Sequence, residues 1–166
     1  RGLEMRGVNY RGFPVDVGSI VALKLLDPAY RFSPLDARRA ADLARLLERL
    51  RGYAIAFDAL PLGLLALLGH SPPEVAQRCL KRLALSGEPL ARLTAALRDG
   101  PALAKKLSRE RSAPPSARAA LMRGRSLESL AGAWLTGSAV ARRQIEWFLV
   151  EGRTVHPLLS GEDLLA

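Results

Sequence analysis

The side chains best suited to catalysis are few in this chain and lie far apart in the sequence. They include two histidines, His70 and His156, and a single cysteine, Cys79. A zinc site needs three or four such ligands at short spacings, and no such spacing is present. His70 precedes a Ser-Pro-Pro-Glu segment and is better explained as a helix-end residue than as a metal ligand. His156 precedes a proline in a linker, where both a solvated role and a position near a phosphate stay open.

Carboxylates for phosphoryl transfer are equally sparse. Two-metal catalysis needs carboxylates that converge on one pair of ions, but the segment with strand-like composition has only Glu4 and Asp16, and no Asp-x-Asp pair occurs. We expect Asp16 to cap a turn or to face solvent. The glycine-rich phosphate-binding motifs are absent, and Ser126 has the setting of a helix cap rather than of a nucleophile. The sequence therefore predicts no catalytic residue and no metal ligand in this chain. Enzymatic activity stays an open question only for a longer protein of which this chain would be a part.

Basic side chains are the functional group that the chain has in excess. It contains 25 Lys and Arg residues against 16 Asp and Glu, which gives a formal net charge of +9. Such an excess favours a polyanionic partner, nucleic acid before an acidic membrane surface. The alternative is a set of solvated basic faces without a partner. The cations that we predict to bind nucleic acid are Lys105, Lys106, Arg118, Arg123, Arg125, Arg142, Arg143 and Arg153.

The spacing of these cations predicts how they would bind. If one helix runs through both, Arg142 and Arg153 return to nearly the same side of it, because eleven residues make about three turns. Trp147 and Phe148 have core-like spacing and do not alternate with the charges, as a base-stacking platform would require. The pattern therefore favours contact with phosphates over the reading of bases.

Helix-start signals recur along the chain and predict the elements that carry these side chains. The segment 33–36, Ser-Pro-Leu-Asp, has the spacing of a capping box with proline in the first turn. Leucines follow it at helical spacing up to Gly52. A similar signal at 71–74 starts a helix that carries Val75, Leu80 and Leu83. Further signals begin helices at Ser86, Ser126, Ser138 and Ser160. The sequence Asp-Gly-Pro at 99–101 predicts a helix end, followed by a short basic helix over 102–109.

These elements predict an all-α fold, an array of about seven or eight short helices joined by short turns. Residues 1–30 have glycines between short β-branched or aromatic runs and predict an extended or hairpin-like lead-in. Residues 31–166 form the helical body, with a candidate division near 69–73. The apolar run at 59–68 is too short to span a bilayer, and a lone cysteine agrees with a reducing compartment. We therefore expect a cytoplasmic protein without a membrane partner.

Three segments of the chain resemble a known family. They are LKRLALSGEPLARLTAAL (80–97), PPSARAALMRGRSLESLAGAWL (114–135) and ARRQIEWFLVEGRTVHPLLSGEDLLA (141–166). Their order is similar to the helical region after the catalytic head of bacterial class II tRNA nucleotidyltransferases, the CCA-adding and A-adding enzymes of the poly(A) polymerase superfamily. The linker at 155–165 is the most specific element, since it resembles a V-x-P-L-L-S-G-E-D-L-L motif. The resemblance covers about 75–166 and marks Ser160, Gly161, Asp163 and Leu164 as family positions that cap and orient a helix.

The resemblance implies a tRNA-binding helical body that contacts RNA phosphates, within a parent enzyme that adds CCA, CC or A with the help of Mg²⁺. The head motifs of the family, including its Asp-x-Asp pair, are absent from this sequence. We therefore expect a fragment without the catalytic head and most of the tail. Such a fragment is not catalytic alone, holds no cofactor, and meets nucleotide triphosphates only through the missing head. The alternative is a non-catalytic helical scaffold or protein-interaction module derived from that region.

Overall fold

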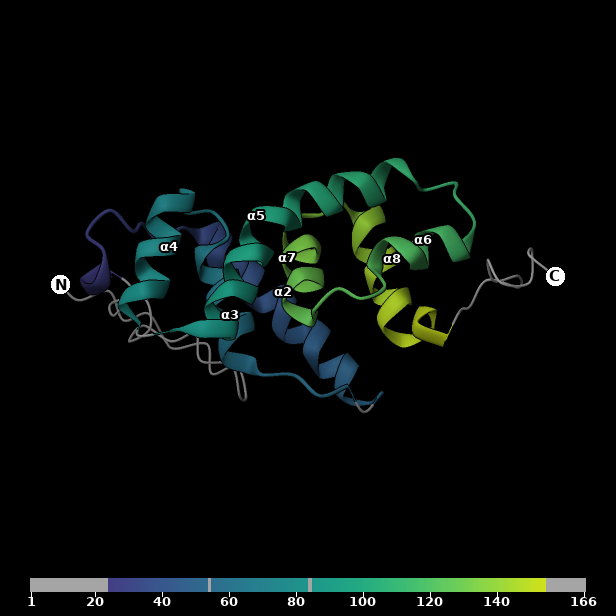
Figure 1. Cartoon of the computed structure of the whole chain (residues 1–166), viewed down its shortest axis with the longest axis horizontal. Helices are drawn as coiled ribbons and strands as arrows, with labels where there is room; N and C mark the ends of the chain where they lie inside the picture. Colours follow the sequence, from purple (N-terminus) through teal and green to yellow (C-terminus); the bar gives the residue numbers. More distant parts are fainter. Residues whose placement is uncertain (1–23, 54, 84, 155–166) are drawn as a thin grey trace.

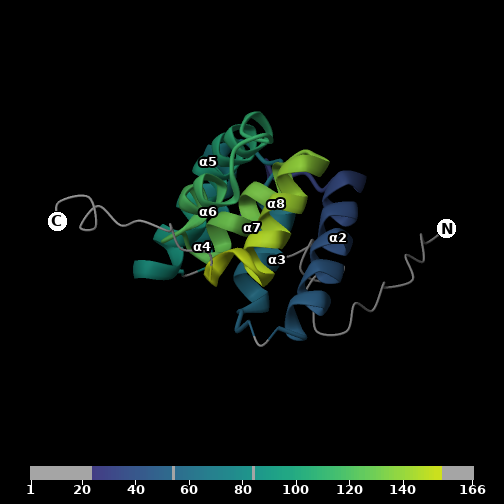
Figure 2. The same ribbon diagram turned by 90° about the vertical axis from the view of Figure 1, so that its right-hand side faces the viewer.

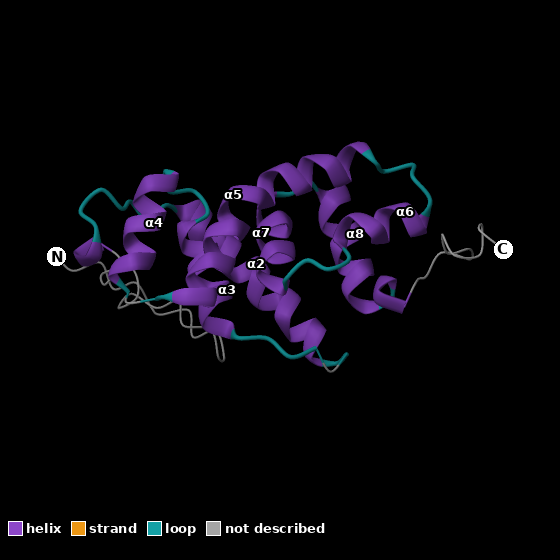
Figure 3. Cartoon of the chain, viewed as in Figure 1, coloured by secondary structure: helices purple, strands orange, loops and turns teal. Residues whose placement is uncertain are grey.

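The computed structural model describes residues 24–53, 55–83 and 85–154, and this part of the chain is helical without a strand (Figure 3). Its elements are α2 (Pro34–Arg51), α3 (Ala59–Leu68), α4 (Pro73–Arg82), α5 (Gly87–Arg109), α6 (Pro115–Met122), α7 (Leu127–Thr136), α8 (Ala139–Val150) and the 3₁₀-helix η1 (Gly152–Thr154). Residues 24–26 add one helical turn. The predicted all-α array of seven or eight helices is confirmed. Most of the predicted lead-in at 1–30 lies outside the described residues.

The helices are arranged around α7, which contacts α5, α3, α8 and α2. Figure 1 shows α4 near one end of the molecule and α6 and α8 near the other, with the long α5 running between them. Seen from the side in Figure 2, α7 lies between α5 and α2. The most extensive contact is between α5 and α7, so this pair forms the frame on which the remaining helices pack.

Helix α2 has the N-terminal capping box and the apolar face that its sequence predicts. The Ser33 hydroxyl accepts a hydrogen bond from the Asp36 N–H, and the Asp36 carboxylate accepts one from the Ser33 N–H at 2.8 Å. This reciprocal capping box satisfies two of the N–H groups that a helix start leaves without partners. The predicted apolar stripe faces the core, since its four leucines are buried: Leu43, Leu46, Leu47 and Leu50.

The predicted helix end at 99–101 is wrong, because α5 continues through Pro101 to Arg109. Gly100 stands where α5 crosses α7, and a Cβ there would lie 2.7 Å from the carbonyl carbon of Gly132. Glycine is needed at this position for close packing rather than for a turn. The buried residues of α5 continue at three- and four-residue spacing on both sides of the proline: Leu93, Ala96, Gly100, Leu103, Ala104 and Leu107. Their burial offsets the roughly 3 kcal/mol that a proline inside a helix costs.

The helix predicted to start at 71–74 is confirmed, since α4 begins at Pro73. Its N-cap is Pro72, which makes no side-chain cap. Leu83 was predicted to belong to this helix, but it follows the last residue of α4 and is 36% exposed. By contrast, Ser126 and Ser138 cap α7 and α8 as predicted, each accepting a hydrogen bond from the N–H three residues later.

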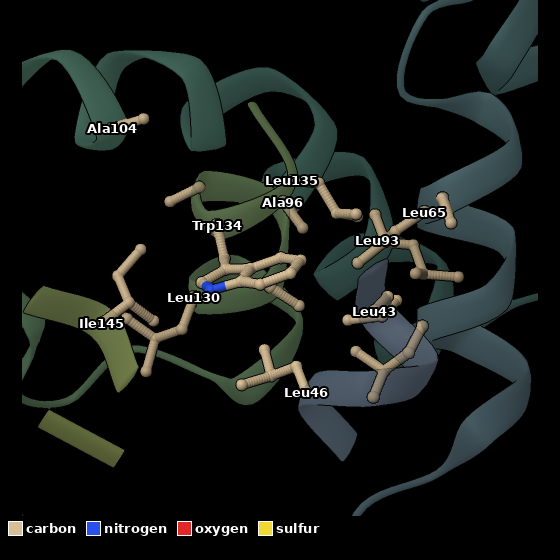
Figure 4. Packing of buried hydrophobic residues seen from close by; sticks show 14 of the residues in the cluster. Leu43, Leu46, Leu65, Leu93, Ala96, Ala104, Leu130, Trp134, Leu135 and Ile145 are labelled. Atoms are coloured by element: carbon tan, nitrogen blue, oxygen red, sulfur yellow. The ribbon is translucent and has the colours of Figure 1, made fainter. Parts of the chain in front are cut away.

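One hydrophobic cluster extends from Tyr30 to Leu149 and includes residues on both sides of 69–73. Trp134 of α7 lies near its middle and is only 4% exposed (Figure 4). Around its indole ring, Figure 4 shows side chains from several helices, among them Leu46 of α2 and Ile145 of α8. The core therefore fixes α8 and α2 against the α5–α7 frame, which matters for the charged groups that these helices carry.

Candidate nucleic-acid interface

The two halves of the described chain differ in how many of their basic side chains form ion pairs. Between 24 and 100 there are twelve Lys and Arg residues, and six of them form ion pairs. Between 101 and 154 there are ten against four glutamates, a surplus of six charges. Six of these ten are exposed and make no ion pair or hydrogen bond with another described residue. We call them the basic end: Lys105, Lys106, Arg109, Arg111, Arg143 and Arg153.

The C-terminal half of α5 supplies most of the basic end. Its buried residues Leu103, Ala104 and Leu107 face the core, so Lys105, Lys106 and Arg109 lie on the solvent side of the helix. Cations in the last turn of a helix also interact favourably with the partial negative charge of its free carbonyls. That effect falls off within one turn, so it accounts for Arg109 better than for Lys105, which lies a full turn earlier.

Helices α5 and α8 meet at this end of the molecule. The hydroxyls of Ser108 and Ser138 are hydrogen-bonded at 2.7 Å, and Ser138 is the N-cap of α8. Arg143 lies in the second turn of α8, and its side chain is exposed. The two helices that carry the exposed cations Lys105, Lys106, Arg109 and Arg143 therefore contact each other at this end of the molecule (Figure 1).

Arg142 plays a different part from its neighbour Arg143. Its guanidinium lies over the Trp134 ring, 4.5 Å from the ring centroid. It donates hydrogen bonds to the carbonyls of Trp134 and Leu135 and, at 3.2 Å, to the Asp42 carboxylate. Those two carbonyls belong to the last turn of α7, and the Trp134 carbonyl also accepts a hydrogen bond from the Gly137 N–H at the C-cap. Arg142 thus caps α7 and joins α8 to α2, and sequence reasoning did not anticipate this.

Arg118 on α6 and Arg125 in the loop after it also contact other parts of the fold. The guanidinium of Arg118 lies over the ring of Trp147, 5.3 Å from the ring centroid, and the Arg118 Nε is buried without a hydrogen-bond partner in the described part of the chain. Arg125 donates from Nε to the carbonyl of Leu121 at 2.8 Å. Arg123 is exposed. Of the predicted contact residues on this helix and its following loop, Arg118 is therefore the one that is held most firmly by the fold.

The helical geometry proposed for Arg142 and Arg153 does not hold. Helix α8 ends at Val150, and Arg153 lies in η1, so the two residues do not share one helix. The sequence spacing also did not reveal that each tryptophan has an arginine over its ring. These arginines cover the rings, so the pairs do not provide an open stacking platform.

Within 24–53, 55–83 and 85–154, the other titratable groups do not gather into a reactive site. Among the described residues, no three His, Cys, Asp or Glu side chains are placed to hold a metal ion. Cys79 is buried, and this burial raises the pKa of its thiol. Partial desolvation, reinforced by the nearby Arg39, lowers the pKa of His70. The family positions Ser160, Gly161, Asp163 and Leu164 lie outside the described residues, as do Asp16 and His156.

Comparison with known proteins adds no relative to this picture. No protein-family model, no curated protein and no solved structure matches the chain. Within the described residues, no helix is both long enough and apolar enough to cross a bilayer.

Proposed function

We propose that this chain is an RNA-binding helical module that contacts the phosphates of structured RNA, with tRNA as its ligand. The observation that carries the proposal is the basic end, six exposed cations without partners among the described residues. Four of them, Lys105, Lys106, Arg109 and Arg143, stand on α5 and α8, whose buried residues belong to one hydrophobic core. Phosphate contacts of this kind supply most of the sequence-independent affinity of proteins for nucleic acids.

The aromatic residues support phosphate contact rather than base stacking. Trp134 is buried beneath Arg142, and Trp147 has Arg118 over its ring. Single-stranded RNA is commonly recognised by bases stacked on open aromatic faces. A rigid helical surface with covered aromatics is better suited to the regular phosphates of a folded RNA.

The biological setting that we propose is the one implied by the resemblance, the helical body of a tRNA nucleotidyltransferase. In that setting, nucleotide triphosphates and Mg²⁺ bind the catalytic head of the parent enzyme, and this chain supports the tRNA. The chain alone should incorporate no nucleotide when incubated with tRNA that lacks its 3′ end, nucleotide triphosphates and Mg²⁺. Nucleotide incorporation by pure material would contradict this part of the proposal.

The test of RNA binding is a titration of tRNA against the chain at several salt concentrations, followed by fluorescence anisotropy. Each phosphate contact contributes about −0.7 to −0.9 to the log–log slope of affinity against salt. The triple variant K105Q/K106Q/R109Q should lower the magnitude of that slope by about two. The matched control K24Q/R38Q/K81Q removes three exposed cations that also have no partner among the described residues, and it should keep the slope.

Two results would count against the proposal. If the wild-type chain shows no salt-dependent binding of tRNA even at low ionic strength, the scaffold alternative becomes the better explanation. If both triple variants lose the same slope, binding is a property of net charge and the basic end is not its site.

A further inference from the structure

A charged groove lies between α2 and α8, two helices whose proximity was not predicted from the sequence. Its volume is about 660 Å³, and its walls include four arginines and two carboxylates that matter here: Arg45, Arg49, Arg142, Arg143, Asp42 and Glu146. Arg45 and Arg49 are one turn apart on α2. The groove therefore gathers cations from two helices that are far apart in the sequence.

The carboxylates of the groove are already shared between several donors. Asp42 forms ion pairs with both Arg45 and Arg142. Glu146 accepts a hydrogen bond from the Trp134 indole N–H at 2.9 Å and lies 3.1 Å from the Arg49 guanidinium. Each carboxylate is also less exposed than the α2 arginine that it meets. These acids therefore hold the inner nitrogens of the arginines and leave other donors turned toward solvent.

Three guanidiniums remain available to an incoming anion. The side chains of Arg45 and Arg49 are 74% and 60% exposed, and each has one ion pair for its five N–H donors. Arg143 makes no ion pair or hydrogen bond with any described residue. The third acid of the wall, Glu48, is bonded to Arg51 at 2.8 Å. Positive charge is thus in surplus within the groove.

We propose that this groove binds a phosphate of the RNA backbone through Arg45, Arg49 and Arg143. The inference rests on the proposed function. It extends the proposed RNA-binding surface from the basic end across α8 to α2. Guanidinium forks match the oxygens of a phosphate and bind it in bidentate fashion. A base cannot stack on the aromatic floor, because Trp134 is 4% exposed and Arg142 covers it.

Arg143 is shared by the two proposed surfaces, since it belongs both to the wall of the groove and to the basic end. Ser138, the N-cap of α8, lies five residues before Arg143 and is hydrogen-bonded to Ser108 of α5. Five residues turn a helix by about 140° beyond one full turn, so Arg143 and the contact with α5 lie on different sides of α8. An RNA that binds both surfaces therefore passes over α8, with Arg143 common to the two contact areas.

The test uses the variant R45Q/R143Q, which removes two cations from opposite walls. It leaves the Arg142–Asp42 and Arg49–Glu146 ion pairs in place, so the fold should be unaffected. We expect tRNA affinity at 0.1 M salt to fall about 30-fold, because two phosphate contacts are lost. The control R38Q/K81Q removes the same charge from exposed sites outside the groove and should change affinity by much less. Far-UV circular dichroism of both variants is the check that their helices remain intact.

Combining R45Q/R143Q with K105Q/K106Q separates this inference from the proposed function. If both surfaces touch one RNA, the losses in salt slope should add. If K105Q/K106Q lowers the slope and R45Q/R143Q behaves like its control, the basic end binds RNA and the groove does not. If the wild type binds no tRNA, both proposals fall together. Inorganic phosphate is the last probe: a thermal shift by phosphate that R45Q/R143Q abolishes, with an unchanged tRNA slope, would assign the groove to free phosphate and overturn its role in RNA binding.

Discussion

Gly100 of α5 and Gly132 of α7 meet backbone to backbone at the crossing of the two central helices. A Cβ at Gly100 would stand 2.7 Å from the Gly132 carbonyl carbon, and a Cβ at Gly132 would stand 2.6 Å from the Ala96 carbonyl oxygen. Neither contact can be relieved by a side-chain rotation, since both involve backbone atoms. The closeness of α5 and α7 therefore depends on the absence of two side chains.

Replacing either glycine by alanine should destabilise the protein. In an open helix the change Gly→Ala is worth about 1 kcal/mol in favour of folding, but here the added methyl forces the helices apart and costs about 1–3 kcal/mol or more. We expect G100A and G132A to lower the free energy of unfolding, measured in urea by circular dichroism. The control is G52A, where a Cβ would stand at an ordinary 3.4 Å and φ is −62°. A G100A variant as stable as G52A would show that α5 and α7 leave room for a methyl group at their crossing.

Arg142 should matter more for stability than its neighbour Arg143. The variant R142A loses the hydrogen bonds to the α7 carbonyls and the contact with Trp134, so we expect a loss of about 2 kcal/mol in the free energy of unfolding. The variant R143A removes a side chain without a partner among the described residues and should change stability by less than about 0.5 kcal/mol. Equal effects on urea unfolding would contradict the capping role of Arg142.

The ion pair between Asp27 and Arg78 should make stability depend on pH. The hydrogen bond from Arg78, 2.6 Å from the carboxylate, holds the pKa of Asp27 below its ordinary value, with help from the Ala29 N–H. A depressed folded-state pKa stabilises the protein above the unfolded pKa of about 3.9, and this contribution disappears as pH falls through the folded-state value. The pair ties the start of the described chain to α4.

We therefore expect the variant R78Q to be less stable than the wild type at pH 6, with the difference shrinking as pH falls below about 4. The measurement is a series of urea unfolding curves between pH 6 and the lowest pH at which the protein stays folded. The variant R38Q serves as the control, since Arg38 has no partner among the described residues. A gap between wild type and R78Q that stays constant with pH would rule out the titration of Asp27 as its cause.

Some of this structure could be predicted from sequence because its causes are local. The capping box of α2 involves residues three apart, and the serine caps of α7 and α8 likewise act within one turn. The course of α5 could not be read in this way, because Pro101 predicts a break and the opposing burial comes from α7. The stripe of buried residues on both sides of Pro101 was the available signal, and its spacing favours one continuous helix.

The candidate site was predictable in its composition but not in its arrangement. A count of charges locates the surplus between 101 and 154. It cannot tell Arg142, which binds α7 and Asp42, from Arg143, which has no partner among the described residues, because the two are adjacent in the sequence. Arg45 and Arg49 were missed for the opposite reason. Nothing in the sequence of α2 indicates that it packs beside α8, about a hundred residues later.

Structured tRNA should compete for this protein better than single-stranded RNA of equal charge. The exposed cations Lys105, Lys106, Arg109 and Arg143 stand on helices that share one hydrophobic core, so their spacing is fixed and suits phosphates that are fixed as well. Both tryptophans lie under arginines, so an unstacked base gains little from them. The measurement is displacement of labelled tRNA, followed by anisotropy, with unlabelled tRNA and with a polyuridine of equal length as competitors. Polyuridine should require a clearly higher concentration for half displacement at 0.1 M salt, and the difference should persist in K24Q/R38Q/K81Q. Equal competition by the two RNAs, together with quenching of tryptophan fluorescence by polyuridine, would instead indicate that Trp147 opens to stack with bases.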